Sequence, residues 1–290
     1  MNGRLSIAWL FMTPAAVLMT VFLLGPLVAV FLLAFTDYQL GAPTVEMIGL
    51  ANFRQLAGDP VFRQSLGNTL LYAMIVVPGS AALGLSAALL INARQSLRTF
   101  YRTVFFLPVM ASLIGMAIVW EFMLHPGFGM ANHIMRFLGL SPQNWLNDRN
   151  LALPVLALIG IWQNFGFSMV LFLAGLANIP ADLYDAAEID GAPNASDRFR
   201  LVTWPLLRPV TVFVLVTSAI RSFQVFDTVH ALTKGGPAKA TEVLLYTIYA
   251  EGFEFFRTGY AAALSVVFVL IITGPGLLRL LRSSRKEETV

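Results

Sequence analysis

The chain carries the stretch Asp185-Ala186-Ala187-Glu188-Ile189-Asp190-Gly191-Ala192 between two long apolar runs. Gly191 can adopt the left-handed backbone that ends a helix at little cost. Asn194 or Ser196 can then cap a second short helix. A polar segment in a chain that is otherwise mostly apolar has little reason to be structured unless something docks on it. We therefore predict that 178–209 forms two short helices at an angle, a protrusion that fits a groove on a partner protein.

This segment resembles the cytoplasmic coupling loop, or EAA loop, of permease subunits in binding-protein-dependent ABC importers. The resemblance implies that the matching positions dock on an ATPase; they are Asp185, Ala186, Ala187, Asp190, Gly191, Ala192, Phe199 and Pro205, with Pro209 beyond them. Two positions depart from the pattern. Asp185 stands where Glu is usual, which shortens the reach of the charge, and Trp204 stands where Leu is usual. The alternative is an amphipathic loop that carries these residues by coincidence.

The composition is typical of a membrane protein. Apolar residues make up 57% and charged residues 12% of the 290 residues, whereas about a quarter of the residues in soluble domains are charged. The apolar runs predict an all-α membrane protein with six transmembrane helices in a single domain, 1–290. The predicted spans are 7–35, 69–92, 103–124, 151–177, 210–226 and 258–278. Each is long enough to cross a hydrocarbon layer of about 30 Å, allowing for tilt and interfacial flanks.

Basic residues predict the orientation, because they concentrate in cytoplasmic loops. One side of the predicted topology carries Arg94, Arg98, Arg102, Arg198, Arg200, Arg208, Arg279, Arg282, Arg285 and Lys286. The other side carries Arg54, Arg63, Arg136, Arg149, Lys234, Lys239 and Arg257, which are spread over longer loops. Both termini and the coupling loop are therefore predicted to lie in the cytoplasm.

The predicted external segments extend the resemblance over nearly the whole chain. The matching stretches begin at Ile48 (I-G-L-A-N-F), Asn68 (N-T-L), His125 (H-P-G-F-G), Phe223 (F-Q-V-F-D) and Thr233 (T-K-G-G-P). The chain is most similar to permeases of the carbohydrate uptake group. This implies a type I importer fold in a bacterial or archaeal cytoplasmic (inner) membrane. It also implies a homologous second permease, two P-loop ATPase subunits, an extracytoplasmic solute-binding protein, and a sugar or oligosaccharide as the solute. Uptake of sn-glycerol 3-phosphate or a related polyol or phosphodiester is the alternative.

Several other functions are disfavoured by what the sequence lacks. There is no Gly-Lys dipeptide and hence no G-x-x-x-x-G-K-[ST] loop, so we expect ATP and magnesium to bind the partner ATPases and no cofactor to bind this chain. The chain has no cysteine and no H-x-x-x-H spacing, so no metal site is predicted. A net charge of +3 is small for a nucleic-acid binder. An ion-coupled secondary carrier stays as the distant alternative, although the first three spans hold few of the ionisable groups that such carriers use.

Two polar stretches interrupt the apolar pattern and are the candidate substrate path. One lies in the fourth span and the other at the external end of the fifth; their candidate residues are Gln163, Asn164, Phe167, Arg221, Ser222 and Gln224. Buried polar groups in hydrocarbon are costly unless they face water or a partner. Amides beside aromatic rings suit a sugar, whereas the alternative is ordinary hydrogen bonding between helices. Arg221 either attracts an anionic substrate or anchors its span at the membrane surface.

Overall fold

The computed structural model describes the backbone of residues 2–93 and 97–287 and the side chains of 11–93, 97–112 and 114–274. Within these residues the chain is helical, with one isolated β-bridge between Thr36 and Met47. It divides into two compact units, one formed by the two ends of the chain (1–63 and 244–290) and one by the middle (64–243). Arg94 lies outside the described residues, as do the side chains of the four basic residues of the C-terminal tail.

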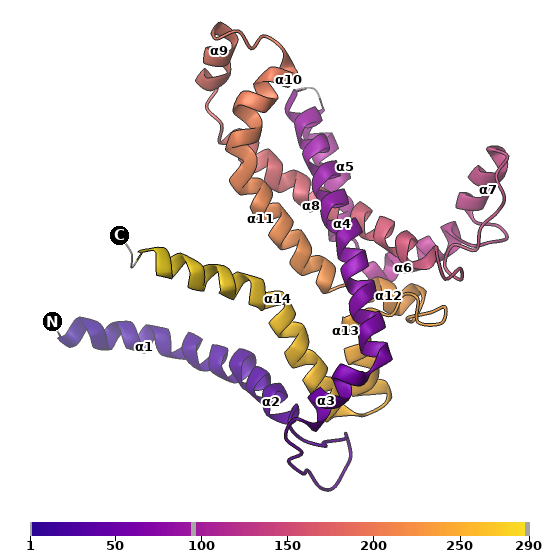
Figure 1. Ribbon diagram of the computed structural model, residues 1–290. Helices are drawn as coiled ribbons and strands as arrows, with labels where there is room; N and C mark the ends of the chain where they lie inside the picture. The colour runs from indigo at the N-terminus through magenta and orange to yellow at the C-terminus, as the bar shows by residue number, and fades with distance from the viewer. Residues whose placement is uncertain (1, 94–96, 288–290) are drawn as a thin grey trace. The chain divides into compact units, whose positions relative to one another are not determined.

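The unit formed by the chain ends contains the first and last apolar helices (Figure 1). Its elements are α1 (Asn2–Met19), the π-helical turn η1 (Thr20–Leu24), α2 (Gly25–Leu33), α3 (Ala51–Gly58), α13 (Leu244–Tyr249), the π-helical turn η3 (Ala250–Glu254) and α14 (Thr258–Glu287). Helix α14 packs on α2 and α3, where Ala34, Ala262 and Ala263 are buried together. These small side chains let the backbones approach closely, as is usual between membrane helices.

Hydrogen bonds fix the connection after α2 in the same unit. The buried side chain of Asn52 in α3 donates to the carbonyl oxygens of Ala34 at 3.0 Å and Thr36 at 2.8 Å. The Gly-Leu-Ala-Asn-Phe stretch that the sequence resemblance singled out therefore has a structural role here, because its asparagine satisfies carbonyl groups at the end of a helix.

The middle unit is a bundle built around α8. Its elements are α4 (Pro60–Ala93), α5 (Arg98–Met110), α6 (Leu113–Met123), α7 (Met130–Phe137), α8 (Ala152–Ala177), α9 (Asp182–Ile189), α10 (Ala195–Arg198), the π-helical turn η2 (Phe199–Thr203), α11 (Trp204–Phe223) and α12 (Asp227–Leu232). Helix α8 contacts α5 and α11. Buried side chains of α4, α8 and α11, including Phe172 and Leu207, form its core.

Two glycines allow the helices of this unit to pack closely. A Cβ atom on Gly84 of α4 would come within 2.6 Å of the Cβ of Ser168 in α8. A Cβ on Gly166 of α8 would collide with the backbone carbonyl of Phe105 in α5. Since backbone atoms cannot move aside as a flexible side chain can, these contacts require glycine.

Four helical segments are long and apolar enough to cross a membrane: 11–33, 60–93, 152–177 and 195–232. The third predicted span, 103–124, is not the single helix that the sequence predicted. It breaks at Ala111 and Ser112, whose backbones are extended with ψ of 139° and 121°, into α5 and α6, which meet at a bend of 100°. Pro108 lies in the last turn of α5, just before the break. The last predicted span, 258–278, coincides with the apolar part of α14, Thr258–Gly274, which is shorter than the four spanning segments. The total of six spans therefore remains a prediction. The single domain remains a prediction too.

The fifth span also begins differently from the prediction. Pro205 lies in the first turn of α11, as a proline should, but Pro209 lies inside the helix rather than in a connection leading to it. Helix α11 ends at Phe223, and the chain turns before α12 begins at Asp227.

Candidate functional site

Helix α9 is terminated by a left-handed turn at Gly191, as the sequence predicted. The N–H of Gly191 donates to the carbonyl of Glu188 at 3.3 Å, and the N–H of Ala192 donates to that of Ala187 at 2.9 Å. Together with a φ of +91° at Gly191, these two bonds make a Schellman motif, which satisfies carbonyls at the helix end. Ala192 is buried behind this turn. The glycine therefore sets the angle at which the chain leaves α9.

The second half of the coupling loop is held to α9 by side chains. The hydroxyls of Tyr184 and Thr203 lie 3.1 Å apart, and Arg198 forms an exposed ion pair with Glu188 at 3.3 Å. Asn194 precedes α10 as predicted, but its side chain contacts Asp197 instead of capping the backbone. Figure 1 shows α9 and α10 at the end of the bundle where α11 begins.

The predicted coupling residues are mostly at the surface of this protrusion. Those with exposed side chains or backbone are Asp185, Ala186, Asp190, Gly191 and Pro205, while Ala187 and Phe199 are half-buried and Ala192 is buried. Phe199 lies in η2, with its ring centre 6.1 Å from that of Trp204. The Trp that replaces the usual Leu thus packs within the loop.

An apolar surface that the sequence reasoning missed surrounds these residues. Ile189 and Leu201 are 86% and 67% exposed. A hollow of about 370 Å³ lies between α9 and η2, lined by Leu183, Ala186, Ala187, Asp190, Gly191, Ala192, Asp197, Leu201 and Val202. Large exposed apolar side chains beside a hollow are typical of a surface that binds another protein. The sequence does contain a signal for this surface, because the apolar residues Ile189 and Leu201 interrupt a polar segment.

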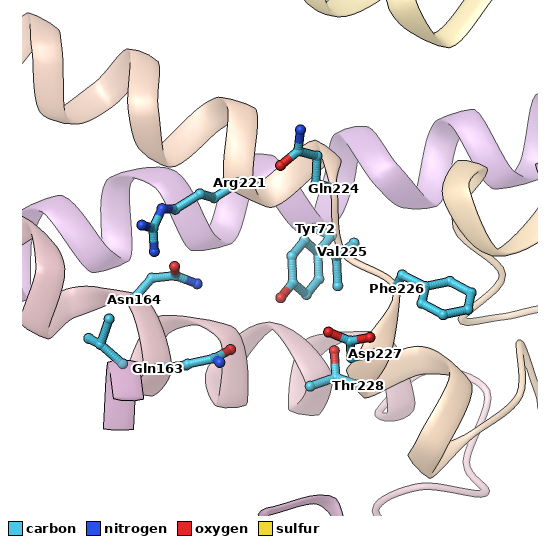
Figure 2. Close-up of a pocket in the computed structure, with 10 residues that line it drawn as sticks. Tyr72, Gln163, Asn164, Arg221, Gln224, Val225, Phe226, Asp227 and Thr228 are labelled. Carbon is cyan, nitrogen blue, oxygen red and sulfur yellow. The ribbon is translucent and has the colours of Figure 1, made fainter. Parts of the chain in front are cut away.

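A polar cavity of about 200 Å³ lies elsewhere in the middle unit (Figure 2), lined by Tyr72, Val109, Gln163, Asn164, Arg221, Gln224, Val225, Phe226, Asp227 and Thr228. Helices α4, α5, α8, α11 and α12 all contribute to it. It brings together four of the six residues predicted for the substrate path: Gln163, Asn164, Arg221 and Gln224.

The other two predicted residues are placed differently. The ring of Phe167 lies under the guanidinium of Arg221, with the Cζ atom 4.0 Å from the ring centre, so it supports the arginine rather than lining the cavity. Ser222 is 2% exposed and is not among the lining residues. Its hydroxyl is buried and has no hydrogen-bond partner within the described part of the chain.

Arg221 and Asp227 give the cavity a charge of each sign. None of the ion pairs among the described residues includes either of them, and Figure 2 shows Arg221 beside Asn164 while Asp227 lies next to Thr228. The arginine instead stacks on Phe167, a cation–π contact.

Tyr72 was missed by the sequence reasoning, because one tyrosine in an apolar helix carries no pattern. It is 3% exposed, and a Cβ on Gly160 of α8 would collide with its hydroxyl group. The amide nitrogen of Asn164 donates to the carbonyl of Gly160 at 2.9 Å, so the oxygen and the second N–H of this amide are left to meet a ligand.

Within the described residues no group of three or more His, Asp or Glu side chains could hold a metal ion. The residues that line the cavity offer amides, hydroxyls, two opposite charges and aromatic rings. These groups bind and orient a polar solute through hydrogen bonds and ring stacking, and they do not form a nucleophile–base constellation.

A helical membrane bundle with a polar cavity and a helical protrusion defines a membrane transport subunit. The chain belongs to the family described as the binding-protein-dependent transport system inner membrane component, which it matches over residues 80–286. It is a multi-pass permease subunit of an ABC importer. This membership favours the importer over the ion-coupled secondary carrier.

Individual relatives agree along most of the chain. It is 35% identical to the lactose transport system permease protein LacF of Rhizobium radiobacter, over 91% of this chain and 89% of that protein. It is also 35% identical to the sn-glycerol-3-phosphate transport system permease protein UgpA of Agrobacterium fabrum, over 78% and 77%.

The fold is that of a bacterial ABC transporter that imports the acidic polysaccharide alginate, with a TM-score of 0.84, 23% identity, and coverage of 98% of this chain and 96% of that one. A second structure shows the bacterial alginate transporter in complex with its alginate pentasaccharide-bound periplasmic protein; it matches with a TM-score of 0.81, 24% identity and coverage of 93% and 92%.

Proposed function

We propose that this chain is the membrane half of an ATP-driven importer for a sugar or oligosaccharide that a solute-binding protein delivers. It pairs with a homologous permease, and two P-loop ATPase subunits bind its coupling loop on the cytoplasmic side. The observation that carries this proposal is the pairing, in one permease chain, of a polar cavity with an apolar docking surface on the coupling loop.

The coupling loop transmits energy and performs no chemistry. Closure of the ATPase dimer moves α9 and η2, and this shifts the permease between inward-facing and outward-facing states. ATP and magnesium stay on the ATPase subunits. The exposed side chains of Ile189 and Leu201 support this role, because burying them in an ATPase groove removes apolar surface from water.

The cavity supports a carbohydrate because its lining matches the surface of a sugar. The amides of Gln163 and Gln224 and the hydroxyl of Thr228 can bond sugar hydroxyls, and the ring of Phe226 can stack on the apolar C–H face. A neutral polyhydroxylated solute satisfies Arg221 and Asp227 together, since hydroxyl groups both accept and donate hydrogen bonds. Ordinary packing between helices is the competing explanation for these polar groups.

The second candidate substrate is sn-glycerol 3-phosphate. Arg221 favours it, because this cation forms no ion pair within the described residues and guanidinium groups bind phosphate well. The relationship to a glycerol-phosphate permease also supports it. Asp227 opposes it, because a carboxylate lining the same cavity repels a phosphate group. Asp227 is therefore the reason to place the sugar first.

The subunit composition is tested by affinity purification of the chain from its native membrane, followed by mass spectrometry and an ATPase assay. We expect a second permease and a P-loop ATPase to co-purify, and ATP hydrolysis to be stimulated by a loaded solute-binding protein. Recovery of the chain alone, without ATPase activity but with solute uptake in liposomes, would overturn the proposal.

The cavity is tested in the reconstituted complex with Gln163→Ala and Gln224→Ala. We expect both to impair uptake while ATP hydrolysis continues, because they remove hydrogen bonds to the solute and leave the coupling loop intact. The matched control is Gln55→Ala, an exposed glutamine of α3. Normal uptake by both cavity variants would place the substrate path elsewhere.

A further inference from the structure

The first turns of α5 present two arginines that form no ion pair with any acidic side chain in the described part of the chain. Arg98 and Arg102 are four residues apart and therefore share one face of the helix. Neither takes part in the ion pairs found among the described residues, and the Nε of each is buried without a hydrogen-bond partner there. Within the described residues, Arg98 donates a hydrogen bond to the side-chain oxygen of Asn92 at 3.4 Å. Both side chains are half-buried, so their guanidinium groups remain partly accessible.

Arg102 lies at one end of an apolar groove of about 380 Å³. The groove is lined by Arg102, Thr103, Phe106, Leu107 and Met110 of α5 and by Val170 of α8. Met110 and Leu107 are 78% and 59% exposed, and the hydroxyl of Thr103 is already donated to the carbonyl of Thr99. The wall below the arginine is therefore a stripe of exposed hydrocarbon two turns long.

The arginine end of the groove lies at the coupling-loop end of the bundle. Arg102 shares the groove with Val170, whereas Val109 shares the polar cavity with Gln163, so α5 and α8 run antiparallel. Helix α8 continues from Val170 towards the coupling loop. The groove thus runs from the arginines, at the membrane surface beside the loop, towards the middle of the bilayer.

We propose that this groove binds an anionic glycerophospholipid, with its phosphate at Arg98 and Arg102 and one acyl chain along Phe106, Leu107 and Met110. Charge complementarity selects this occupant, because two unpaired guanidinium groups at a membrane surface attract a lipid phosphate. The apolar wall excludes a free phosphate ion as the occupant, since such an ion would leave the hydrocarbon stripe uncovered. This lipid site shares no lining residue with the polar cavity. The proposal therefore does not depend on which solute is transported.

The selectivity comes from the headgroup rather than from the tail. An acyl chain is as well solvated by the bilayer as by leucine and methionine side chains, so the groove fixes its position without a large gain in affinity. Each arginine near the surface contributes about 1 kcal/mol to binding of an anionic lipid, which corresponds to about fivefold in affinity per arginine.

The test is native mass spectrometry of the purified full chain, with the subunits that accompany it, in an equimolar mixture of phosphatidylglycerol and phosphatidylcholine. The wild type is expected to retain phosphatidylglycerol preferentially. Arg102→Gln should lower this preference about fivefold, and the double variant with Arg98→Gln should lower it further. Arg149→Gln, at an exposed arginine outside the groove, is the matched control and should behave as the wild type.

Blocking the groove separates a seated lipid from charge attraction alone. Met110→Trp fills the groove and should reduce phosphatidylglycerol retention, whereas Met74→Trp, at another exposed methionine (66%), should not. An unchanged preference in Arg102→Gln, or unchanged retention in Met110→Trp, would overturn the proposal. So would displacement of the lipid by inorganic phosphate. An unaltered thermal unfolding midpoint shows that each variant is folded.

Discussion

Replacing Gly191 by leucine should uncouple transport from ATP hydrolysis. The φ of Gly191 is +91°, a backbone conformation that residues with a Cβ atom rarely adopt. A Cβ built at this position meets nothing within 4 Å, so the first atom of a side chain adds no clash. The main cost of the substitution is therefore backbone strain in the turn that ends α9.

That strain can be given a magnitude. Left-handed backbone costs a residue with a side chain about 1–2 kcal/mol, and sparsely populated regions cost up to about 3 kcal/mol. Since 1.4 kcal/mol is a factor of ten, the ratio of molecules with the correct turn to molecules without it falls by about fivefold to about a hundredfold. Alanine should be nearly as harmful as leucine, because both carry a Cβ. Asparagine should be milder, since it tolerates this conformation.

The assay is uptake and substrate-stimulated ATP hydrolysis by the reconstituted importer, with membrane insertion checked by blotting. The control is Gly139→Leu after α7. Gly139 has a φ of +74°, open space around its Cβ, and the same two hydrogen bonds of a Schellman motif, but it lies outside the coupling loop. Normal uptake by well-inserted Gly191→Leu protein, or equal loss in Gly139→Leu, would refute the coupling role of the turn.

Three further substitutions test packing, loop order and charge. Gly84→Ala pushes α4 away from Ser168, which lies 2.6 Å from the new Cβ, and should lower the unfolding midpoint in detergent by an overpacking cost of about 1–3 kcal/mol. Asn132→Ala removes the acceptor of the Trp145 indole N–H at 3.0 Å and should make the loop between α6 and α8 more sensitive to limited proteolysis, whereas unchanged cleavage would contradict this role. Arg221→Gln should lower uptake of an anionic solute about tenfold more than uptake of a neutral sugar, since hydrogen bonds to charged groups contribute about 1.5–3 kcal/mol; equal losses would show that the charge does not contact the solute.

The turn after α9 could be predicted from the sequence because its cause is local. A glycine that follows a short helix adopts left-handed backbone for reasons contained in a few neighbouring residues, and the two hydrogen bonds at Gly191 and Ala192 follow from that conformation. The break in the third span could not be predicted in the same way. Apart from Thr103, Ser112 and Glu121 its residues are not polar, so hydropathy gives no clear boundary, and Pro108 alone permits either a kink or a continuous span.

The composition of the cavity was only partly predictable. Gln163 and Gln224 are conspicuous, because an amide in an apolar run is unusual. Tyr72 and Thr228 are not conspicuous, and their positions depend on how α4, α8 and α12 pack. The close approach of Gly160 to the Tyr72 hydroxyl shows what the sequence does not reveal, namely which residues of different helices pack together. Here a small residue on one helix makes room for a large residue on another. Such pairs lie far apart in the chain and carry no periodic signal.

The connection between the two sites follows from the order of the helices. Helix α8 carries Gln163 and Asn164 and runs directly into the coupling loop. Helix α11 begins within the last residues of the loop and carries Arg221 near its far end. Helices α8 and α11 pack closely beside the loop, where a Cβ atom on Gly175 would come within 2.8 Å of the Leu207 side chain. A close-packed interface resists deformation and shifts as a unit. On the proposed mechanism, a pull on α9 therefore moves two walls of the cavity together, without any change in side-chain chemistry at the cavity itself.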